Sequence, residues 1–250
     1  MARRLCRVFQ HRVGCLVTPL HEIRMIISHR HKFIFLKTSK TAGTSIEIAL
    51  SRICGEDDVI TPLAKEDEEL RRSLGCRSSQ NYLPELSRLR QKPNRQLTKQ
   101  EGFFNHMPGH RVRSLVHPEV WRTYFKFCVA RNPWDRVLSQ YYWRHQQEPR
   151  PDMTSFIAGP HVQTLMRKGY LLYTRDGELL VDHICRFETL ELEMQLLSER
   201  LNLREQLQLT RAKGTFRADK RHYRAIFSQN QADLIATIFR KEIALLGYSF

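Results

Sequence analysis

The sequence has no long apolar run, since no window approaches the ~18 apolar residues of a membrane-spanning helix. Its start, MARRLCRVFQHRVGCLVTPLHEI, is interrupted too often by Arg, His and Glu for a secretory signal peptide. No period of roughly 20 to 50 residues repeats, which argues against a solenoid. We therefore expect a soluble, cytoplasmic protein.

Metal-binding signatures are also missing. The cysteines form no C-x-x-C pair and no close Cys/His cluster with zinc spacing. No H-E-x-x-H motif or carboxylate cluster is present. We expect reduced thiols and a protein that needs no metal. The six cysteines are Cys6, Cys15, Cys54, Cys76, Cys128 and Cys185.

Acidic residues are scarce relative to basic ones. The sequence contains 26 Asp and Glu and 41 Lys and Arg, which gives a formal net charge of +15. This excess favours an anionic partner such as a nucleotide, an acidic glycan, a phospholipid or nucleic acid, and charge alone does not choose among them.

The chain reads as one domain with a basic extension. Residues 1–24 are basic and weakly periodic, and either the start codon is assigned too early or a basic arm packs or binds there. Residues 25–250 form the domain, with 41% hydrophobic content over the chain to build its core. A long polar insertion interrupts it at about residues 76–105.

A strand-loop-helix pattern occurs twice. We expect a strand at 33–37, a turn through 43 and a helix over 44–53, then a strand at 124–130 and a helix from Pro133 to about residue 147. Interleaved strands and helices predict an α/β fold with a central, mainly parallel sheet between two helical layers. Three later features are an Asp176-Gly177 hairpin turn and helices at 190–201 and 231–246, the last ended by Gly247.

The first loop, KTSKTAGTSIE, combines the features of an anion site. The start of the helix offers backbone N–H groups and the positive end of the helix dipole. Gly43 permits close approach, and Lys40 adds a full charge. The hydroxyl donors are Thr41, Thr44 and Ser45, although Thr44 or Ser45 as a simple N-cap is the alternative.

This loop is not a nucleoside-triphosphate P-loop, because its lysine precedes the glycine and no Gly-Lys dipeptide opens the helix.

The second loop places Arg131 at a strand end and Ser139 eight residues later in the following helix. Arginine grips phosphate bidentately, and a serine hydroxyl completes such a site. Two anion loops suggest one nucleoside with phosphates at both ends.

At these residues the sequence resembles a known family. KTSKTAGTS resembles the 5'-phosphosulfate loop, and VARNPWDRVLSQYY the 3'-phosphate motif, of sulfotransferases that use 3'-phosphoadenosine 5'-phosphosulfate (PAPS), especially the carbohydrate-type, family 2-like branch. The resemblance extends over most of residues 25–250, including VDHICRFETLE and LLGYSF, and departs at Ser39, where the family usually has proline. It implies a P-loop-like, three-layer α/β/α fold.

The resemblance also implies residue roles. Lys40 corresponds to the lysine that contacts the leaving bridge oxygen, and Arg131 and Ser139 to the 3'-phosphate pair. Lys213, in a later basic cluster, is similar in placement to a second 3'-phosphate contact, unless that cluster is only a solvated face. The product would be 3',5'-adenosine bisphosphate. The 5' cradle would be Thr41, Ala42, Gly43, Thr44 and Ser45.

Sulfuryl transfer also needs a base for the acceptor hydroxyl. We expect His106, with His110 as the substitute, because a histidine with a pKa of about 6.5 is poised for this step. Glu47 is an alternative for orienting substrate, whereas Asp135 and Arg136 are expected to be structural.

The acceptor is expected to be a hydroxyl of a carbohydrate or glycan, and no nucleic-acid partner is expected. Two other functions stay open, a divergent P-loop small-molecule kinase and a non-catalytic polyanion-binding protein of the same fold. The oligomeric state is not indicated. Residues that suit an anionic glycan, or simply form a solvated face, are Arg88, Arg90, Lys92, Arg95 and Lys99.

Overall fold

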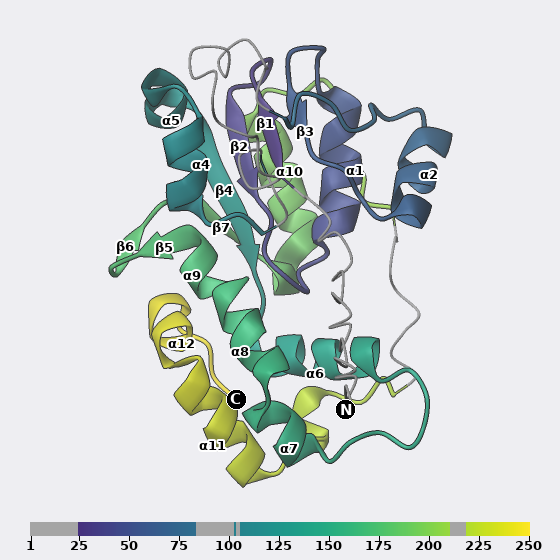
Figure 1. Ribbon diagram of the computed structural model, residues 1–250, viewed down its shortest axis with the longest axis vertical. Helices are drawn as coiled ribbons and strands as arrows, with labels where there is room; N and C mark the ends of the chain where they lie inside the picture. Colours follow the sequence, from purple (N-terminus) through teal and green to yellow (C-terminus); the bar gives the residue numbers. More distant parts are fainter. Residues whose placement is uncertain (1–24, 84–102, 104–105, 211–218) are drawn as a thin grey trace, which may run out of the picture.

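The centre of the molecule is a five-stranded sheet (Figure 1). The computed structural model describes residues 25–83, 103, 106–210 and 219–250. The strand order is β3-β1-β2-β4-β7, with β2 parallel to β4 and β4 parallel to β7. The strands are β1 (Ile26–Ser28), β2 (Phe33–Leu36), β3 (Val59–Ile60), β4 (Phe125–Ala130) and β7 (His183–Arg186).

The prediction of a mainly parallel sheet is not confirmed, because β1 is antiparallel to both β2 and β3. Only residues 29–32 separate β1 from β2, and so short a connection can join only antiparallel strands. The sheet is therefore mixed. Its parallel half comprises β2, β4 and β7, and both expected strand-loop-helix units belong to this half.

Helices cover both faces of the sheet, as expected for a three-layer α/β protein. Ile46 of α1 and Met194 of α10 pack with Phe35 and Phe127 on one face. Val112 of α4 and residues of α9 pack on the other. The helices of these layers are α1 (Gly43–Ile53) and α10 (Leu190–Arg200) on the first face, and α4 (Gly109–Leu115), α5 (Pro118–Thr123) and α9 (Tyr170–Tyr173) on the second.

A second group of helices lies beyond the carboxyl end of β4, in the lower part of Figure 1. These helices share a core that includes Trp134, Phe156 and Phe239. The expected helix over 231–246 is two helices, with the break at Phe239, and Gly247 ends the second with a φ of 64°. They are α6 (Pro133–Arg144), α7 (Met153–Ala158), α8 (Pro160–Arg167), α11 (Gln229–Ile238) and α12 (Arg240–Leu246), with the short helix η2 (Tyr223–Ala225).

The remaining elements are small. Helix α2 (Lys65–Ser73) follows β3, and η1 (Phe187–Thr189) follows β7. The predicted Asp-Gly hairpin is present as β5 (Thr174–Arg175) and β6 (Glu178–Leu179). None of the helices in the described ranges combines the length and apolar character needed to cross a membrane.

Several predictions fall on residues outside the described ranges. These are the basic extension 1–24, most of the polar insertion and Lys213. The described start of the insertion lies against the sheet, where Gln80 forms a bridge with Ile60. The four cysteines within the described ranges, Cys54, Cys76, Cys128 and Cys185, are buried free thiols, as expected.

A buried ion pair joins α6 to α12. Arg136 donates to both carboxylate oxygens of Glu242, at 2.9 and 2.6 Å, and their side chains are 0% and 1% exposed. Tyr173 donates a further hydrogen bond to Glu242, at 3.1 Å. Arg136 is thus the packing residue that the sequence suggested, and it fixes the last helix against α6.

We predict that Glu242→Ala lowers the free energy of unfolding by about 3–5 kcal/mol, because it leaves the buried Arg136 guanidinium without its counter-charge. Urea unfolding followed by circular dichroism measures the change. The control is Glu119→Ala, which breaks an exposed pair with Arg122 and should change stability by less than about 1 kcal/mol. Equal small effects of the two substitutions would show that the buried pair is not structural.

Candidate active site

The first anion loop runs from the end of β2 to the start of α1. The N-cap of α1 is Ala42, whose methyl group cannot accept a hydrogen bond, so the helix has no side-chain cap. The first helical backbone bond runs from Ile46 N to Ala42 O, at 3.1 Å, and the amides of the first turn have no acceptor within the helix. Thr44 and Ser45 lie inside the helix, so the simple capping explanation does not hold.

The backbone of this region is strained. Lys40, Ala42 and His106 have φ values of 65°, 57° and 50°, in the left-handed region that non-glycine residues rarely adopt. Each such residue costs about 1–3 kcal/mol and persists only where its surroundings enforce it. Strain of this kind gathers at binding and catalytic sites.

A buried ion pair supports the loop from inside. Lys37 Nζ lies 2.6 Å from Glu47 Oε2 and donates to Thr44 Oγ1 at 3.2 Å. The Lys37 and Glu47 side chains are only 4% and 0% exposed. Glu47, the expected alternative for orienting substrate, is therefore bound to a lysine of the protein itself.

The loop glycine is required by the same lysine. A Cβ on Gly43 would lie 2.6 Å from both Cγ and Cε of Lys37, closer than real Cβ contacts come. The Lys37 side chain therefore crosses the start of α1 at the one residue without a Cβ.

The threonine hydroxyls of the loop are used internally. Thr41 is buried, with its Oγ1 2.8 Å from Thr38 Oγ1. The Thr38 hydroxyl in turn donates to the Val129 carbonyl of β4. These bonds attach the loop to the neighbouring strand, so the backbone N–H of Thr41 is its better candidate for contacting an anion.

The second loop meets the first directly. Arg131 follows β4, and its Nη1 donates to the Lys40 carbonyl at 3.0 Å. Its Nε donates to Asp135 Oδ2 at 2.8 Å, and its guanidinium carbon lies 4.0 Å from the ring centroid of Phe187. Asp135 thus has the structural role expected of it, because it orients Arg131.

One face of α6 borders both loops. Asp135, Ser139 and Trp143 are spaced four residues apart and so lie along one face of the helix. Asp135 contacts Arg131, and Lys40 Nζ lies 4.8 Å from the Trp143 ring centroid. Half-buried Ser139 lies on this face, between Asp135 and Trp143 along the helix.

His106 also belongs to this site. Its Nδ1 lies 2.8 Å from the Lys37 carbonyl, at the start of the first loop. A carbonyl only accepts, so Nδ1 carries the proton in this hydrogen bond. In the neutral ring, Nε2 is then the basic nitrogen.

His110, the substitute base, is in a different environment. It lies in the first turn of α4, and burial, followed by the charges of Arg175 and Arg111, lowers its pKa. Arg175, whose charge contributes to this shift, belongs to the β5–β6 hairpin and not to the first loop. His106, by contrast, contacts the first loop through the Lys37 carbonyl.

Comparison with known proteins identifies the family of the chain. A model of the sulfotransferase family, family 2, matches residues 24–178, which is more than half of the chain. The chain belongs to the sulfotransferase family. An uncharacterized protein of Archaeoglobus fulgidus is 27% identical to this sulfotransferase over 106 residues, or 40% of this chain and 87% of that protein. No solved structure matches the chain.

The structure adds site residues that the sequence did not reveal. Asn132 caps α6 by accepting from Trp134 N at 3.1 Å, and its own N–H donates to Glu188 Oε1 at 2.6 Å. Glu188 also accepts from the Tyr248 hydroxyl at 3.1 Å. In this sulfotransferase the Arg131 loop is therefore held by the segment after β7. An asparagine directly before Pro133 was the available signal for the cap.

We predict that Gly43→Ala lowers the stability of this sulfotransferase by about 1–3 kcal/mol, since the new methyl displaces the buried Lys37 side chain. Chemical denaturation measures the loss. Gly55→Ala is the matched control, because the nearest atom to its Cβ, Arg30 Cδ, is 3.6 Å away. Equal stability of the two variants would show that Lys37 can move aside freely.

Proposed function

We propose that this sulfotransferase transfers the sulfuryl group of PAPS to a hydroxyl of a carbohydrate. Family members generally take the group from PAPS and pass it to a hydroxyl-bearing acceptor. The observation that carries the proposal is the hydrogen bond between Arg131 and the Lys40 carbonyl, because it brings both anion loops to one place.

The residues present suit both ends of the PAPS nucleotide. Ala42 provides no side-chain cap at the start of α1, where the positive end of the helix dipole suits the 5'-phosphosulfate. Arg131 and Ser139 suit the 3'-phosphate, with Asp135 orienting the guanidinium. PAPS supplies the activated sulfuryl group, whose bond to the 5'-phosphate breaks on transfer.

Lys40 is proposed to stabilise the leaving group. Negative charge develops on the bridge oxygen as its bond to sulfur breaks, and an ammonium group placed there acts mainly in the transition state. The strained backbone of Lys40 and its position over Trp143 keep this side chain at the junction of the two loops.

His106 is proposed as the base. Its Nδ1–H bond to the Lys37 carbonyl orients the ring, and Nε2 takes the proton of the acceptor hydroxyl while the acceptor oxygen bonds to sulfur. The imidazolium then releases this proton to solvent. No atom changes its oxidation state in this transfer.

The carbohydrate acceptor is supported by Trp143. This indole is 38% exposed and lies beside Lys40, where one face of a sugar ring can pack against an aromatic surface. The basic residues between 88 and 99 lie outside the described ranges. The cytoplasmic location, the role of Lys213 and the lack of a metal requirement for sulfuryl transfer stay predictions.

A thermal shift experiment tests the nucleotide. We predict that 3',5'-adenosine bisphosphate at 100 times its Kd stabilises the protein by about 2.7 kcal/mol, whereas ATP with magnesium has little effect. Arg131→Ala should remove most of this stabilisation. A larger shift with ATP and magnesium would favour the kinase, and polyanion binding that survives Arg131→Ala without a nucleotide shift would favour the non-catalytic protein.

Transfer of radiolabelled sulfate from PAPS to a panel of glycans, lipids and phenols tests the reaction. We predict incorporation into a glycan, with Lys40→Ala reducing kcat about 10²–10³-fold, the usual effect of removing one such contact. His106→Ala should reduce it by about 10²–10⁴-fold, as general-base catalysis contributes that much.

Two substitutions away from the loops serve as controls for this assay. Lys241→Ala removes an exposed lysine and His31→Ala a histidine beside the β1–β2 turn, and both should retain wild-type kcat. Equal activity in Lys40→Ala and Lys241→Ala would remove the proposed role of Lys40. Preferential labelling of phenols or lipids would instead overturn the carbohydrate assignment alone.

A further inference from the structure

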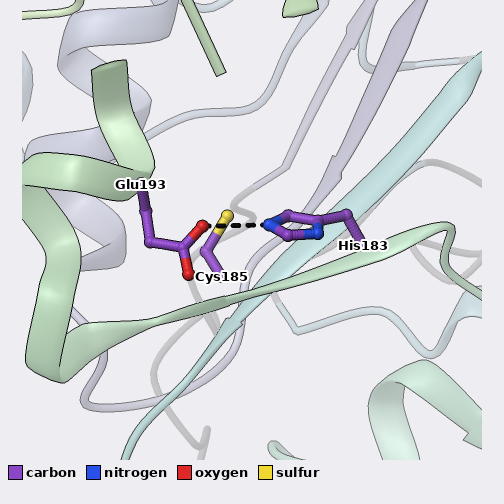
Figure 2. A group of neighbouring side chains, drawn as sticks. All are labelled: His183, Cys185 and Glu193. Carbon is purple, nitrogen blue, oxygen red and sulfur yellow. Dashed lines mark hydrogen bonds and ion pairs between the residues drawn. The ribbon is translucent and has the colours of Figure 1, made fainter. Parts of the chain in front are cut away.

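Three potential metal ligands converge between β7 and α10, and none of them is a residue of the two anion loops. His183 and Cys185 are two residues apart on β7, so their side chains lie on the same face of the strand. Glu193 comes from α10, and Figure 2 shows all three side chains directed toward one another. One ligand atom from each lies within 4.8 Å of the others.

The donors form a chemically consistent set. Imidazole nitrogen, thiolate sulfur and carboxylate oxygen are the three ligand types that zinc takes in proteins. A thiolate and a carboxylate together balance the charge of one divalent ion, which matters because Cys185 is 0% and Glu193 8% exposed. The His183 side chain is 43% exposed, so an ion can enter from its side.

The distance between the imidazole and the carboxylate also suits an inserted ion. His183 Nε2 and Glu193 Oε2 are 2.9 Å apart, whereas tetrahedral zinc with these ligands separates neighbouring donor atoms by roughly 3.3–3.6 Å. A small outward movement is therefore enough for an ion to replace this hydrogen bond. Glu193 Oε1 accepts from Arg186 N at 2.7 Å, an orienting bond of the kind that metal-binding carboxylates have.

We propose that His183, Cys185 and Glu193 bind one zinc ion, with a water as the fourth ligand. The Cys/His spacing of the sequence did not indicate this site. The site consists of one H-x-C pair on a strand and a glutamate that follows the cysteine by eight residues, on a helix. None of the three ligands is a residue of either anion loop. His183 pairs with Phe127 and Cys185 with Val129, so the ligands precede the Ala130–Arg186 pair that leads into Arg131.

The proposed ion has a structural role. It joins β7 to α10 on either side of η1, the segment that contains Glu188 and Phe187. Those two residues contact Asn132 and Arg131 of the second anion loop. Zinc would therefore stabilise the support of that loop without contacting substrate.

Metal titration of the full chain tests this site. The protein is stripped with a chelator, dialysed and titrated with zinc chloride against a chromophoric competitor. We predict that wild type binds one more tight zinc ion per chain than His183→Ala. In His183→Ala the affinity of this site for zinc should fall by at least about 10–100-fold, because substitutions of residues that only orient metal ligands already cause a loss of this size. Zinc should also raise the Tm of wild type and not that of His183→Ala.

Cobalt chloride gives a spectroscopic test of the sulfur ligand. Wild type should show a thiolate-to-cobalt charge-transfer band that Cys185→Ser and Glu193→Gln lose or weaken. The matched controls are Cys54→Ser and His31→Ala, which should bind both metals as wild type does. If Cys185→Ser does not fold, His183→Ala provides the deciding comparison, because the His183 side chain is partly exposed. Zinc binding and a cobalt band unchanged in His183→Ala would overturn the proposal.

Discussion

The hydrogen bond from Arg131 to the Lys40 carbonyl is the contact on which the site depends. This contact exists because β2 and β4 are adjacent parallel strands, with Leu36 paired to Cys128. The two loops that follow these strands therefore leave the sheet at the same edge. Carboxyl ends of neighbouring parallel strands are where α/β proteins bind ligands. Two loops separated by about ninety residues of sequence thus become a single surface.

The surface is maintained at an energetic cost. Left-handed backbone at Lys40 and Ala42 is unfavourable for residues with a Cβ. The compensation lies beneath the loop, in the buried pair of Lys37 with Glu47 and the hydroxyl bonds of Thr38. A buried ion pair adds little net stability but strongly disfavours arrangements that separate its charges. The pair therefore specifies the loop conformation more than it stabilises the fold.

The sequence predicted the parts of this site that local chemistry determines. A strand followed by a Gly-containing loop, or by Asn132 before Pro133, marks where a helix begins. The pairing of Lys37 with Glu47 was not predictable, because a lysine at a strand end and an acid in a first helical turn each have an ordinary local explanation. The antiparallel position of β1 was missed for a different reason: no strand was assigned before residue 33, and the short connection that dictates the antiparallel pairing is apparent only once β1 is recognised.

The match to the sulfotransferase family ends at residue 178, yet the second anion loop rests on later residues. Phe187 lies under the Arg131 guanidinium, and Glu188 accepts from Asn132 N and from the Tyr248 hydroxyl. The matched region therefore contains the residues proposed to contact the nucleotide, while part of their support comes from outside it. Because a bidentate phosphate contact depends on the orientation of the guanidinium plane, this support is as necessary to the proposed specificity as Arg131 itself.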